Sequence, residues 1–309
     1  MKKYTFIVVI IFYAIFTLLE FKFQPVPAYC DGYWYIKVAQ NIANGKGMVE
    51  DIVLYHFPRI EKMKKFPHPI GNYWNPLNSI ILAGFYKIFG ITNYTSRLAA
   101  FIIDLIVVLT IFFIAKKLFS DDLFIAIFSS LIYIVHYYSL TLRAFSGLPE
   151  TYTTLFLVPA LYFLYLSLTK RWDYVILSSL FGGLSYLSRN ESGIYVILLL
   201  VLFILRKKYK ENFRWFLTGI LIFLITVSWW EIRNFVIFGK YTGEMKKNLL
   251  LCNEFFDYMC FNKQWTIKEW LSDGIMNVVI RKFASLHYKI DSFISIVHWI
   301  VGTFLFYPL

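Results

Sequence analysis

Asp31 is the residue of this chain best suited by type and surroundings to transfer a proton. It follows the first apolar segment and begins the aromatic-rich stretch 31–35, which includes Tyr33. A carboxylate at a membrane surface, beside aromatic rings, can accept the proton of an attacking hydroxyl group. Aspartate is also a preferred helix N-cap, so Asp31 is explained equally well as the cap of a helix over 33–44. The two roles are compatible, and we take Asp31 as the candidate catalytic residue.

Three short segments each carry an arginine with a carboxylate within seven residues. A guanidinium group donates several charge-assisted hydrogen bonds to phosphate oxygens, so such arginines suit a phosphate ligand. A single arginine at a membrane surface is more often an ordinary contact to lipid headgroups. The repetition in three segments favours the phosphate-binding interpretation. The three pairs are Arg143 with Glu150, Arg189 with Glu191, and Arg233 with Glu231.

A basic segment around 59–65 adds further candidates. It ends at Lys65 and is followed by His68 between two prolines. A basic segment with aromatic neighbours fits an anionic lipid phosphate, although such a run is more often a solvated surface. The substrate-binding candidates are Tyr33, Lys65, His68, Arg143, Glu150, Arg189, Glu191 and Arg233.

The spacing of cysteines and histidines does not predict a metal site. The three cysteines include no closely spaced pair of the zinc-ribbon kind. The histidines outside the apolar segments have no second ligand at the spacing that metal sites use. We therefore expect no cofactor. A divalent cation is compatible with the sequence but is not indicated by it.

The chain that must position these residues is too apolar for a soluble fold. Hydrophobic residues make up 59% of its 309 positions and charged residues 16%, against roughly 45–50% apolar residues in ordinary soluble domains. The net charge of +12 would suit nucleic acid, but membrane proteins collect lysine and arginine on cytoplasmic loops. We therefore predict an integral membrane protein with the lipid bilayer, and no nucleic acid, as a partner.

Apolar runs near the roughly 20 residues needed to cross a bilayer predict about eight spans. A further run at 75–90 is shorter and begins with the helix-start signal Asn75-Pro76. The predicted spans are 4–20, 98–115, 122–140, 151–169, 173–188, 192–205, 215–232 and 290–308.

The positive-inside rule decides whether 75–90 crosses the membrane. If it does not cross, nine lysines and arginines near the ends of short loops lie inside, and only Arg143 and Arg189 lie in short outer loops. If 75–90 crosses, those nine residues lie outside, and Arg143 and Arg189 lie inside. We therefore place 75–90 in the outer interface, with both termini inside. The nine are Lys116, Lys117, Lys170, Arg171, Arg206, Lys207, Lys208, Lys210 and Arg214.

The predicted fold is an all-α, polytopic transmembrane bundle that forms a single domain over 1–309. Its outer face consists mainly of outer loop one at 21–97 and outer loop two at 233–289, where most of the candidate residues fall. Outer loop one contains amphipathic helices at the membrane surface. In the helix over 33–44, an apolar face of Tyr35, Val38, Ala39 and Ile42 lies opposite Lys37, Gln40, Asn41 and Asn44.

Four stretches resemble the membrane glycosyltransferases of the GT-C superfamily, in the branch with dolichyl-phosphate-mannose protein mannosyltransferases and aminoarabinose lipid A transferases. The resemblance lies in their order and in their common outward placement. The stretches are Asp31 to Gly47, Tyr73 to Leu77 with Phe89-Gly90 and Ser96-Arg97, Leu187 to Glu191, and Trp230 to Asn234 with Phe238-Gly239.

The resemblance implies transfer of a sugar from a polyprenyl-phosphate donor to a lipid, protein or glycan acceptor, on the outer face of the cytoplasmic membrane. It implies that Asp31 matches the acidic residue of the first outer loop, the proposed base, and that Arg189 and Arg233 loosely match basic positions near the lipid phosphate. Many relatives have a second acid where this chain has Gly32. Relatives also run longer, so we expect a fragment or a shortened member.

Two other classes of function fit the sequence. A transporter or flippase of lipid-linked saccharides would place its polar site near the bilayer midplane, on interrupted helices. Asp104, Pro159 and Gly182-Gly183 interrupt the predicted spans. A charge within a span, such as Asp104, is by default a functional hypothesis, although packing against a polar neighbour explains it equally well. A non-catalytic accessory subunit is the third class, and the short chain favours it.

Overall fold

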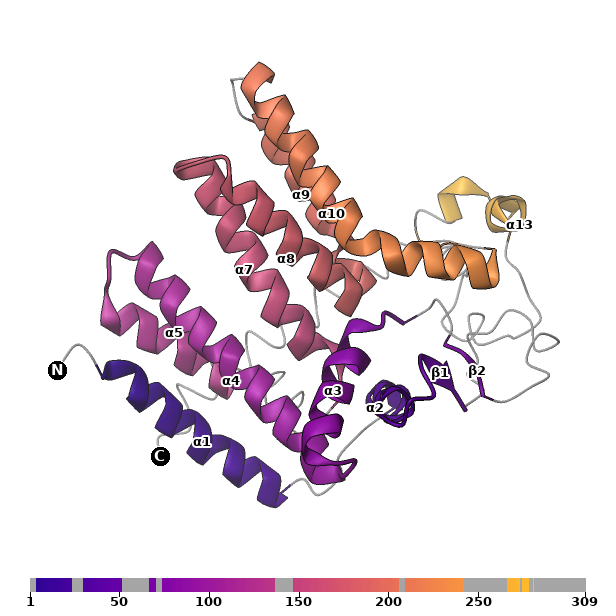
Figure 1. Ribbon diagram of the computed structural model, residues 1–309. Helices are drawn as coiled ribbons and strands as arrows, with labels where there is room; N and C mark the ends of the chain where they lie inside the picture. The colour runs from indigo at the N-terminus through magenta and orange to yellow at the C-terminus, as the bar shows by residue number, and fades with distance from the viewer. Residues whose placement is uncertain are drawn as a thin grey trace. The chain divides into compact units, whose positions relative to one another are not determined.

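The computed structural model describes residues 4–23, 30–51, 67–70, 74–136, 147–205, 209–239, 241, 266–272, 274–277 and 280. The chain divides into two compact units. The first comprises Met1–Ile52 and Phe66–Gly239, and the second comprises Val53–Lys65 and Lys240–Leu309. The second unit contributes helix α13 (Ile267–Ser272) to the described residues. The described residues of the candidate site lie in the first unit, whose helices and strands are labelled in Figure 1.

Three helices of the first unit are long and apolar enough to cross a membrane. They lie in α4 (Asn93–Leu118), α7 (Pro149–Thr169) and the Phe213–Phe238 part of α10 (Tyr209–Phe238). Their positions agree with three of the predicted spans, and the all-α membrane fold is confirmed. The count of about eight spans is not confirmed by length and composition alone.

Shorter apolar helices cover four more of the predicted spans, and the predicted span 290–308 lies outside the described residues. Among them, α5 begins where the side chain of Asp122 accepts hydrogen bonds from the backbone N–H groups of Phe124 and Ile125, at 2.8 and 3.2 Å. Such an N-cap fixes the start of a helix. The four are α1 (Thr5–Phe23), α5 (Leu123–Val135), α8 (Tyr174–Ser188) and α9 (Ile194–Leu205).

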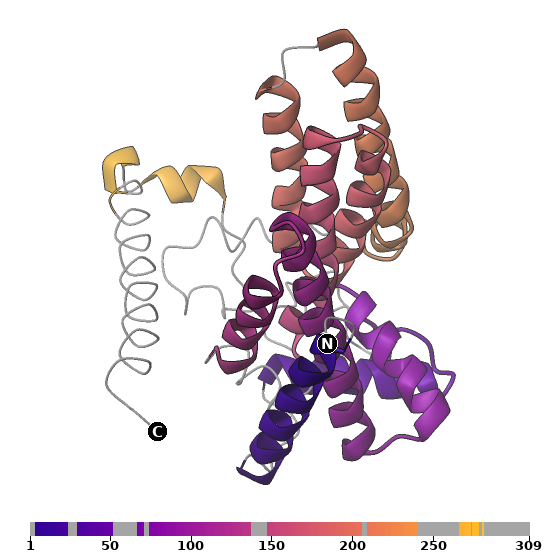
Figure 2. The same ribbon diagram turned by 90° about the vertical axis from the view of Figure 1, so that its left-hand side faces the viewer.

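Helix α8 packs closely against its neighbours because it is rich in small residues. A Cβ added to Gly182 would lie 2.6 Å from the ring of Tyr195 on α9, and one on Gly183 would lie 2.7 Å from Thr226 on α10. Ser178 donates a hydrogen bond of 2.7 Å to the carbonyl oxygen of Ala160 on α7. Figure 2 shows these helices side by side. The middle of α8 is therefore in close contact with α7, α9 and α10.

Helices α2 (Cys30–Ala43) and α3 (Leu77–Phe89) pack against each other before the long helices begin. The predicted apolar face of α2 is confirmed, because Tyr35, Val38 and Ala39 are buried. Ser79 of α3 donates a hydrogen bond of 3.0 Å to the carbonyl oxygen of Tyr35. With only 13 residues, α3 is about 20 Å long, which is shorter than the roughly 30 Å hydrocarbon core. The placement of α3 at the interface stays a prediction, because α5 and α9, which cover predicted spans, are no longer than α3.

The prediction of the polar face of α2 was wrong at one position. Asn41 was expected on the polar face but is 5% exposed. Its side-chain amide donates to the carbonyl oxygen of Val49 at 3.0 Å and to the carboxylate of Asp51 at 3.2 Å. These bonds satisfy the buried amide and hold the returning chain against α2. Asp31 also differs from expectation, since it lies in the first turn of α2 instead of preceding the helix as its cap.

A short antiparallel pair of strands follows α2. Strand β1 (Val49–Glu50) pairs with β2 (His68–Pro69), and Glu50 lies opposite His68. The sequence did not predict these strands, because each has only two residues and no alternating pattern can be seen at that length. The pair brings Glu50 and His68 together across 17 intervening positions of the chain.

Candidate functional site

Asp31 lies within electrostatic reach of two other candidate residues. Its pKa is raised first by desolvation and then by the negative charge of Glu150, while the positive charge of Arg189 lowers it. These residues come from the start of α2, the first turn of α7 and the end of α8. The structure therefore brings Asp31, Glu150 and Arg189 together, although they are far apart in sequence.

Gly147 explains how α7 comes so close to α2. Its φ of +94° lies in the left-handed region, and a Cβ on this residue would lie 2.7 Å from the carbonyl oxygen of Gly32. Glycine is therefore required both by conformation and by the close approach of the two backbones. Helix α7 begins two residues later at Pro149, and Glu150 lies in its first turn, next to the start of α2.

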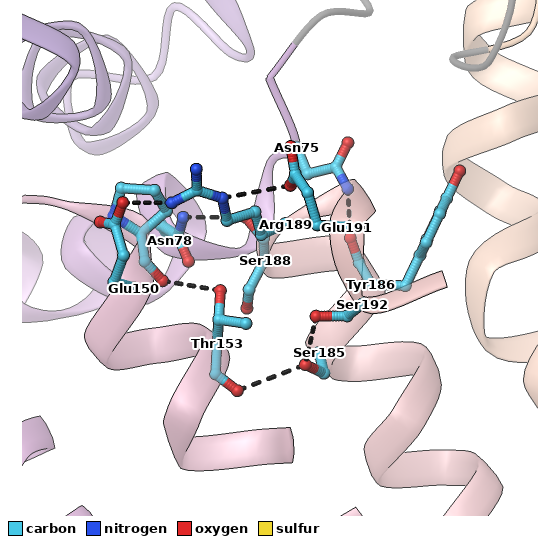
Figure 3. Close-up of polar contacts among 11 residues, drawn as sticks. Asn75, Asn78, Glu150, Thr153, Ser185, Tyr186, Ser188, Arg189, Glu191 and Ser192 are labelled. Atoms are coloured by element: carbon cyan, nitrogen blue, oxygen red, sulfur yellow. Dashed lines mark hydrogen bonds and ion pairs between the residues drawn. The ribbon is translucent and has the colours of Figure 1, made fainter. Parts of the chain in front are cut away.

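Arg189 is engaged by two carboxylates. Its Nη1 contacts Oε1 of Glu150, and its Nε donates to Oε2 of Glu191 at 3.1 Å (Figure 3). Burial alone would lower the pKa of Arg189, and the charges of Glu150 and Glu191 more than offset this effect and raise it. We call Asp31, Glu150, Arg189 and Glu191 the Arg189 cluster.

Hydrogen bonds to the backbone fix the turn that carries Arg189. The amide of Asn78 donates to the carbonyl oxygen of Ser188 at 3.2 Å, and the amide of Asn75 donates to that of Tyr186 (Figure 3). Ser185 donates to the carbonyl oxygen of Thr153 at 3.3 Å and so joins α8 to the first turns of α7. The backbone positions of Arg189 and Glu150 are therefore linked.

The hydroxyl group of Tyr35 lies within electrostatic reach of all four residues of this cluster. Burial raises its pKa well above the usual value, and the charge of Asp31 raises it further. Arg189 acts in the opposite direction, and Glu150 and Glu191 add to the increase. The hydroxyl of Tyr35 therefore keeps its proton at neutral pH and remains a hydrogen-bond donor.

A second cluster forms around Glu50, which is 1% exposed. Trp34 of α2 donates its indole N–H to Oε2 of Glu50, and Nε2 of His68 lies 3.2 Å from Oε1. The charge of Glu50 also acts on Arg233 of α10. Burial lowers the pKa of His68, with a smaller opposite effect from Asp51, so His68 is neutral at pH 7. We call Trp34, Glu50, His68 and Arg233 the Glu50 cluster.

Arg233 holds the segment after β2 against α10. Its Nη1 donates to the carbonyl oxygen of Ile70 at 2.9 Å, and its guanidinium carbon lies 4.8 Å from the centroid of the Trp230 ring. The prediction ended the seventh span at 232, whereas α10 continues to Phe238, so Arg233 lies on the helix and not in a loop. Its neighbour in sequence, Glu231, accepts a hydrogen bond of 2.9 Å from the hydroxyl of Tyr186.

Three aromatic rings pack together beside the two clusters. The rings of Trp34 and Tyr35 are 5.0 Å apart, and both pack against Trp74, at 4.7 and 6.1 Å. Trp34 contacts Glu50, and Tyr35 lies within electrostatic reach of Asp31. Trp34 and Tyr35 are adjacent on α2 and therefore interact with different clusters.

The remaining sequence candidates fall elsewhere. Tyr33 is 49% exposed, and the ammonium group of Lys37 lies 5.7 Å from its ring centroid. Lys65 and Arg143 lie outside the described residues. The sequence reasoning missed Glu50, because a single acid in a short irregular segment carries no periodic signal and its partners are distant in sequence. Across the described ranges, no three His, Cys, Asp or Glu side chains are grouped to hold a metal ion.

Asp104 has a polar neighbour within the bundle. Its carboxylate is 1% exposed and accepts a hydrogen bond of 2.7 Å from the hydroxyl of Tyr133 on α5. This contact joins α4 to α5. The hydrogen bond agrees with packing against, or a proton shared with, a polar neighbour, and a functional role of Asp104 stays a prediction.

Comparisons with known proteins agree with this architecture. Two crystal structures of ArnT from Cupriavidus metallidurans share the fold. The structure bound to undecaprenyl phosphate has a TM-score of 0.57 at 15% identity, over 76% of this chain and 42% of that one. The apo structure has a TM-score of 0.54 at 16% identity, over 85% and 46%. The chain thus spans less than half the length of either ArnT chain.

Sequence comparison identifies the family. No curated protein matches this chain. The model of the dolichyl-phosphate-mannose-protein mannosyltransferase family matches residues 68–230, which is more than half of the chain. This range includes α3, α4, α7, α8 and most of α10, and it contains Glu150, Arg189 and Glu191. The chain is a helical membrane protein that belongs to the dolichyl-phosphate-mannose-protein mannosyltransferase family, within the GT-C glycosyltransferases.

Proposed function

We propose that this protein is a glycosyltransferase that moves a sugar from a polyprenyl-phosphate-linked donor to a hydroxyl group of a lipid, protein or glycan acceptor. Membership of the family supports transfer of a sugar. A polyprenyl donor is supported by ArnT, which shares the fold and whose crystal structure contains undecaprenyl phosphate. The observation that carries the proposal is the meeting of Asp31 with the Arg189–Glu150 pair in a member of this family.

Asp31 is the proposed base. Its raised pKa makes its carboxylate a stronger base than an exposed aspartate. In the proposed reaction, the acceptor hydroxyl gives its proton to Asp31 while its oxygen forms a bond to the anomeric carbon. The bond from that carbon to the phosphate oxygen breaks, and the lipid phosphate leaves with the electron pair. No second proton transfer is needed, because the phosphate leaves as an anion.

The proposed role of Arg189 and Arg233 is to stabilise the departing phosphate. Developing negative charge is stabilised by donors that are already held in place. The backbone hydrogen bonds around residues 185–189 supply such support for Arg189. Tyr33, Lys65, His68 and Arg143 stay predicted substrate contacts, and Glu150 and Glu191 act through their ion pairs with Arg189. We place the site on the outer face of the cytoplasmic membrane because the distribution of lysine and arginine favours that orientation.

The decisive experiment compares Asp31→Asn with wild type. The two proteins are purified in detergent, and release of sugar from a polyprenyl-phosphate sugar is measured. We expect a loss of turnover of about 100-fold or more, the usual contribution of a general base. Asp121→Asn is the control, because Asp121 is exposed and pairs only with Lys117 among the ion pairs described. Undiminished turnover in Asp31→Asn would exclude Asp31 as the base.

The same assay separates transfer from transport. Flipping of a lipid-linked sugar requires two membrane leaflets, whereas bond cleavage proceeds in detergent micelles. Release of sugar in micelles therefore supports an enzyme. Absence of release with every donor tested, together with movement of lipid-linked sugar across vesicles, would favour a transporter.

A further inference from the structure

Arg189 is largely engaged by carboxylates in the state described. Two of its nitrogen atoms are already engaged, Nη1 by Glu150 and Nε by Glu191. Two carboxylates contact this guanidinium group, and that of Asp31 lies within electrostatic reach of it. A phosphate that entered this arrangement unchanged would meet an excess of negative charge, and like charges at short range repel. Donor binding at this position therefore requires Arg189 to change partners.

We propose that Glu150 holds the place on Arg189 that the phosphate of the lipid donor takes, so that donor binding exchanges one anionic partner of the guanidinium for another. The inference rests on the proposed function and adds a regulatory step to it. Glu150 acts through Arg189 and is therefore a positioning residue. The exchange keeps Arg189 ordered before the donor arrives.

Glu150 is the stronger of the two competitors for Arg189. The side chain of Glu150 is 21% exposed and that of Glu191 is 59% exposed. Water screens an exposed ion pair and leaves it weak, whereas a partly buried pair is screened less. Removing the charge of Glu150 should therefore release Arg189 for phosphate, and removing that of Glu191 should have a smaller effect.

The exchange requires movement of side chains only. The turn that carries Arg189 is bonded to α3 through Asn78 and to α7 through Ser185. Glu150 lies in the first turn of α7, where the positive end of the helix dipole stabilises a carboxylate without a basic partner. Its Oε2 is buried and accepts no hydrogen bond from the part of the chain that the structure describes. Glu150 can therefore release Arg189 without displacement of the turn or of the start of α7.

The exchange also affects the base. Arg189 lowers the pKa of Asp31 and Glu150 raises it. When the guanidinium turns towards a phosphate, Asp31 loses part of the positive influence while Glu150 keeps its negative charge. Asp31 then binds a proton more strongly. Donor binding thus makes the base stronger at the stage when the acceptor must be deprotonated.

The test measures affinity for undecaprenyl phosphate, which contains no sugar and cannot react. Wild type, Glu150→Gln, Glu191→Gln and Arg189→Gln are reconstituted in nanodiscs and titrated with this lipid. Glutamine keeps the shape of the side chain and removes its charge. We expect Glu150→Gln to bind about tenfold more tightly, which is the effect of removing one competing charge interaction of ordinary strength. Glu191→Gln should change affinity by less than about twofold, and Arg189→Gln should weaken binding.

Glu231→Gln is the matched control for net charge, because it also removes one carboxylate charge. The carboxylate of Glu231 accepts a hydrogen bond from Tyr186 and does not belong to the Arg189 cluster. Its affinity should stay near wild type. A gain of affinity cannot come from general damage to the fold, so tighter binding by Glu150→Gln alone supports the exchange. An equal gain in Glu231→Gln would assign the effect to overall charge and overturn the proposal.

Failure of the inference can be distinguished from failure of the proposed function. If Arg189→Gln weakens binding but Glu150→Gln does not strengthen it, the exchange is wrong and the transferase proposal stands. If wild type does not bind the lipid, both are wrong. Should Glu150→Gln not fold, Glu150→Asp keeps the charge and shortens the side chain, and it should still bind the lipid more tightly. Unchanged or weaker binding by that variant overturns the exchange.

Discussion

The Arg189 cluster and the Glu50 cluster each place a carboxylate within electrostatic reach of a guanidinium group, but in different surroundings. In the Arg189 cluster, Arg189 and Glu191 are partly or largely exposed, and acids outnumber the base. In the Glu50 cluster, the acid is buried beneath Trp34 and His68, and Arg233 also bonds to a backbone carbonyl group. The first arrangement allows charges to change partners. The second arrangement joins the strand pair after α2 to α10.

The largest expected effect is the loss of the Glu50 carboxylate. Glu50→Ala leaves the indole N–H of Trp34 without its acceptor and removes the charge that acts on Arg233. Leaving a buried donor without its acceptor costs about 1–3 kcal/mol, and more where the lost acceptor is charged. We expect a loss of stability of this size, measured by unfolding in mixed detergent and SDS micelles.

Glu191→Ala is the comparison for that experiment, because Glu191 is 59% exposed and pairs with Arg189. An exposed pair contributes about 0–1 kcal/mol, so this variant should unfold near wild type. Glu50→Gln, which keeps an oxygen for Trp34, should recover part of the stability. Equal losses in Glu50→Ala and Glu191→Ala would show that burial does not distinguish the clusters.

A smaller effect is expected from Gly147→Ala. The added Cβ would lie 2.7 Å from the carbonyl oxygen of Gly32, and φ is +94°. A residue held in such a conformation costs about 1–3 kcal/mol. The backbone must move to relieve the contact, and this separates Glu150 from Asp31, so turnover should fall as well. Unfolding and sugar release are both measured.

Gly84→Ala on α3 is the matched variant, because a Cβ there has nothing within 4 Å. Alanine in place of a helical glycine should stabilise the protein by roughly 0.5–1 kcal/mol. Wild-type turnover in Gly147→Ala, despite reduced stability, would mean that the contact between α2 and α7 does not set the geometry of the Arg189 cluster.

The smallest effect expected is a shift in the pH dependence of transfer. Asp31 must be ionised to act as a base, so activity is present above its pKa and is lost as pH falls through it. Burial and Glu150 raise this pKa, so activity should be lost at a higher pH than an exposed aspartate would give. Rates across pH in Glu150→Gln should show the midpoint lower than in wild type.

Arg189→Gln should shift the same midpoint in the opposite direction, because Arg189 lowers the pKa of Asp31. His68→Asn should leave it unchanged, since His68 belongs to the Glu50 cluster and does not act on Asp31. Shifts of the same sign in Glu150→Gln and Arg189→Gln would contradict the assignment of this titration to Asp31.

Much of the fold could be predicted because its signals are local. Apolar runs located α4, α7 and α10, and helical spacing identified the buried face of α2. The end of α10 was missed because apolar residues continue as far as Phe238, beyond the predicted limit at 232. Asn41 was assigned to the wrong environment because its partner, the carbonyl oxygen of Val49, becomes available only when the chain turns back.

The candidate site was less predictable because its partners come from distant segments. Arg189 and Glu191 are two residues apart, and their pairing follows from proximity in sequence. Glu150 was grouped with Arg143 for the same reason, but its carboxylate contacts Arg189, 39 positions away. Glu50 acquires its role from three elements that meet only in the folded protein. Sequence spacing detects the charged groups but not which of them pair in the folded protein.

The contact between Gly147 and Gly32 has a mechanical consequence. Where two main chains touch with no side chain between them, rotation of side chains cannot take up a displacement of either one. A displacement of the start of α2 is therefore transmitted to the start of α7. A substrate that displaces the start of α2 should therefore move Asp31 and Glu150 in the same direction.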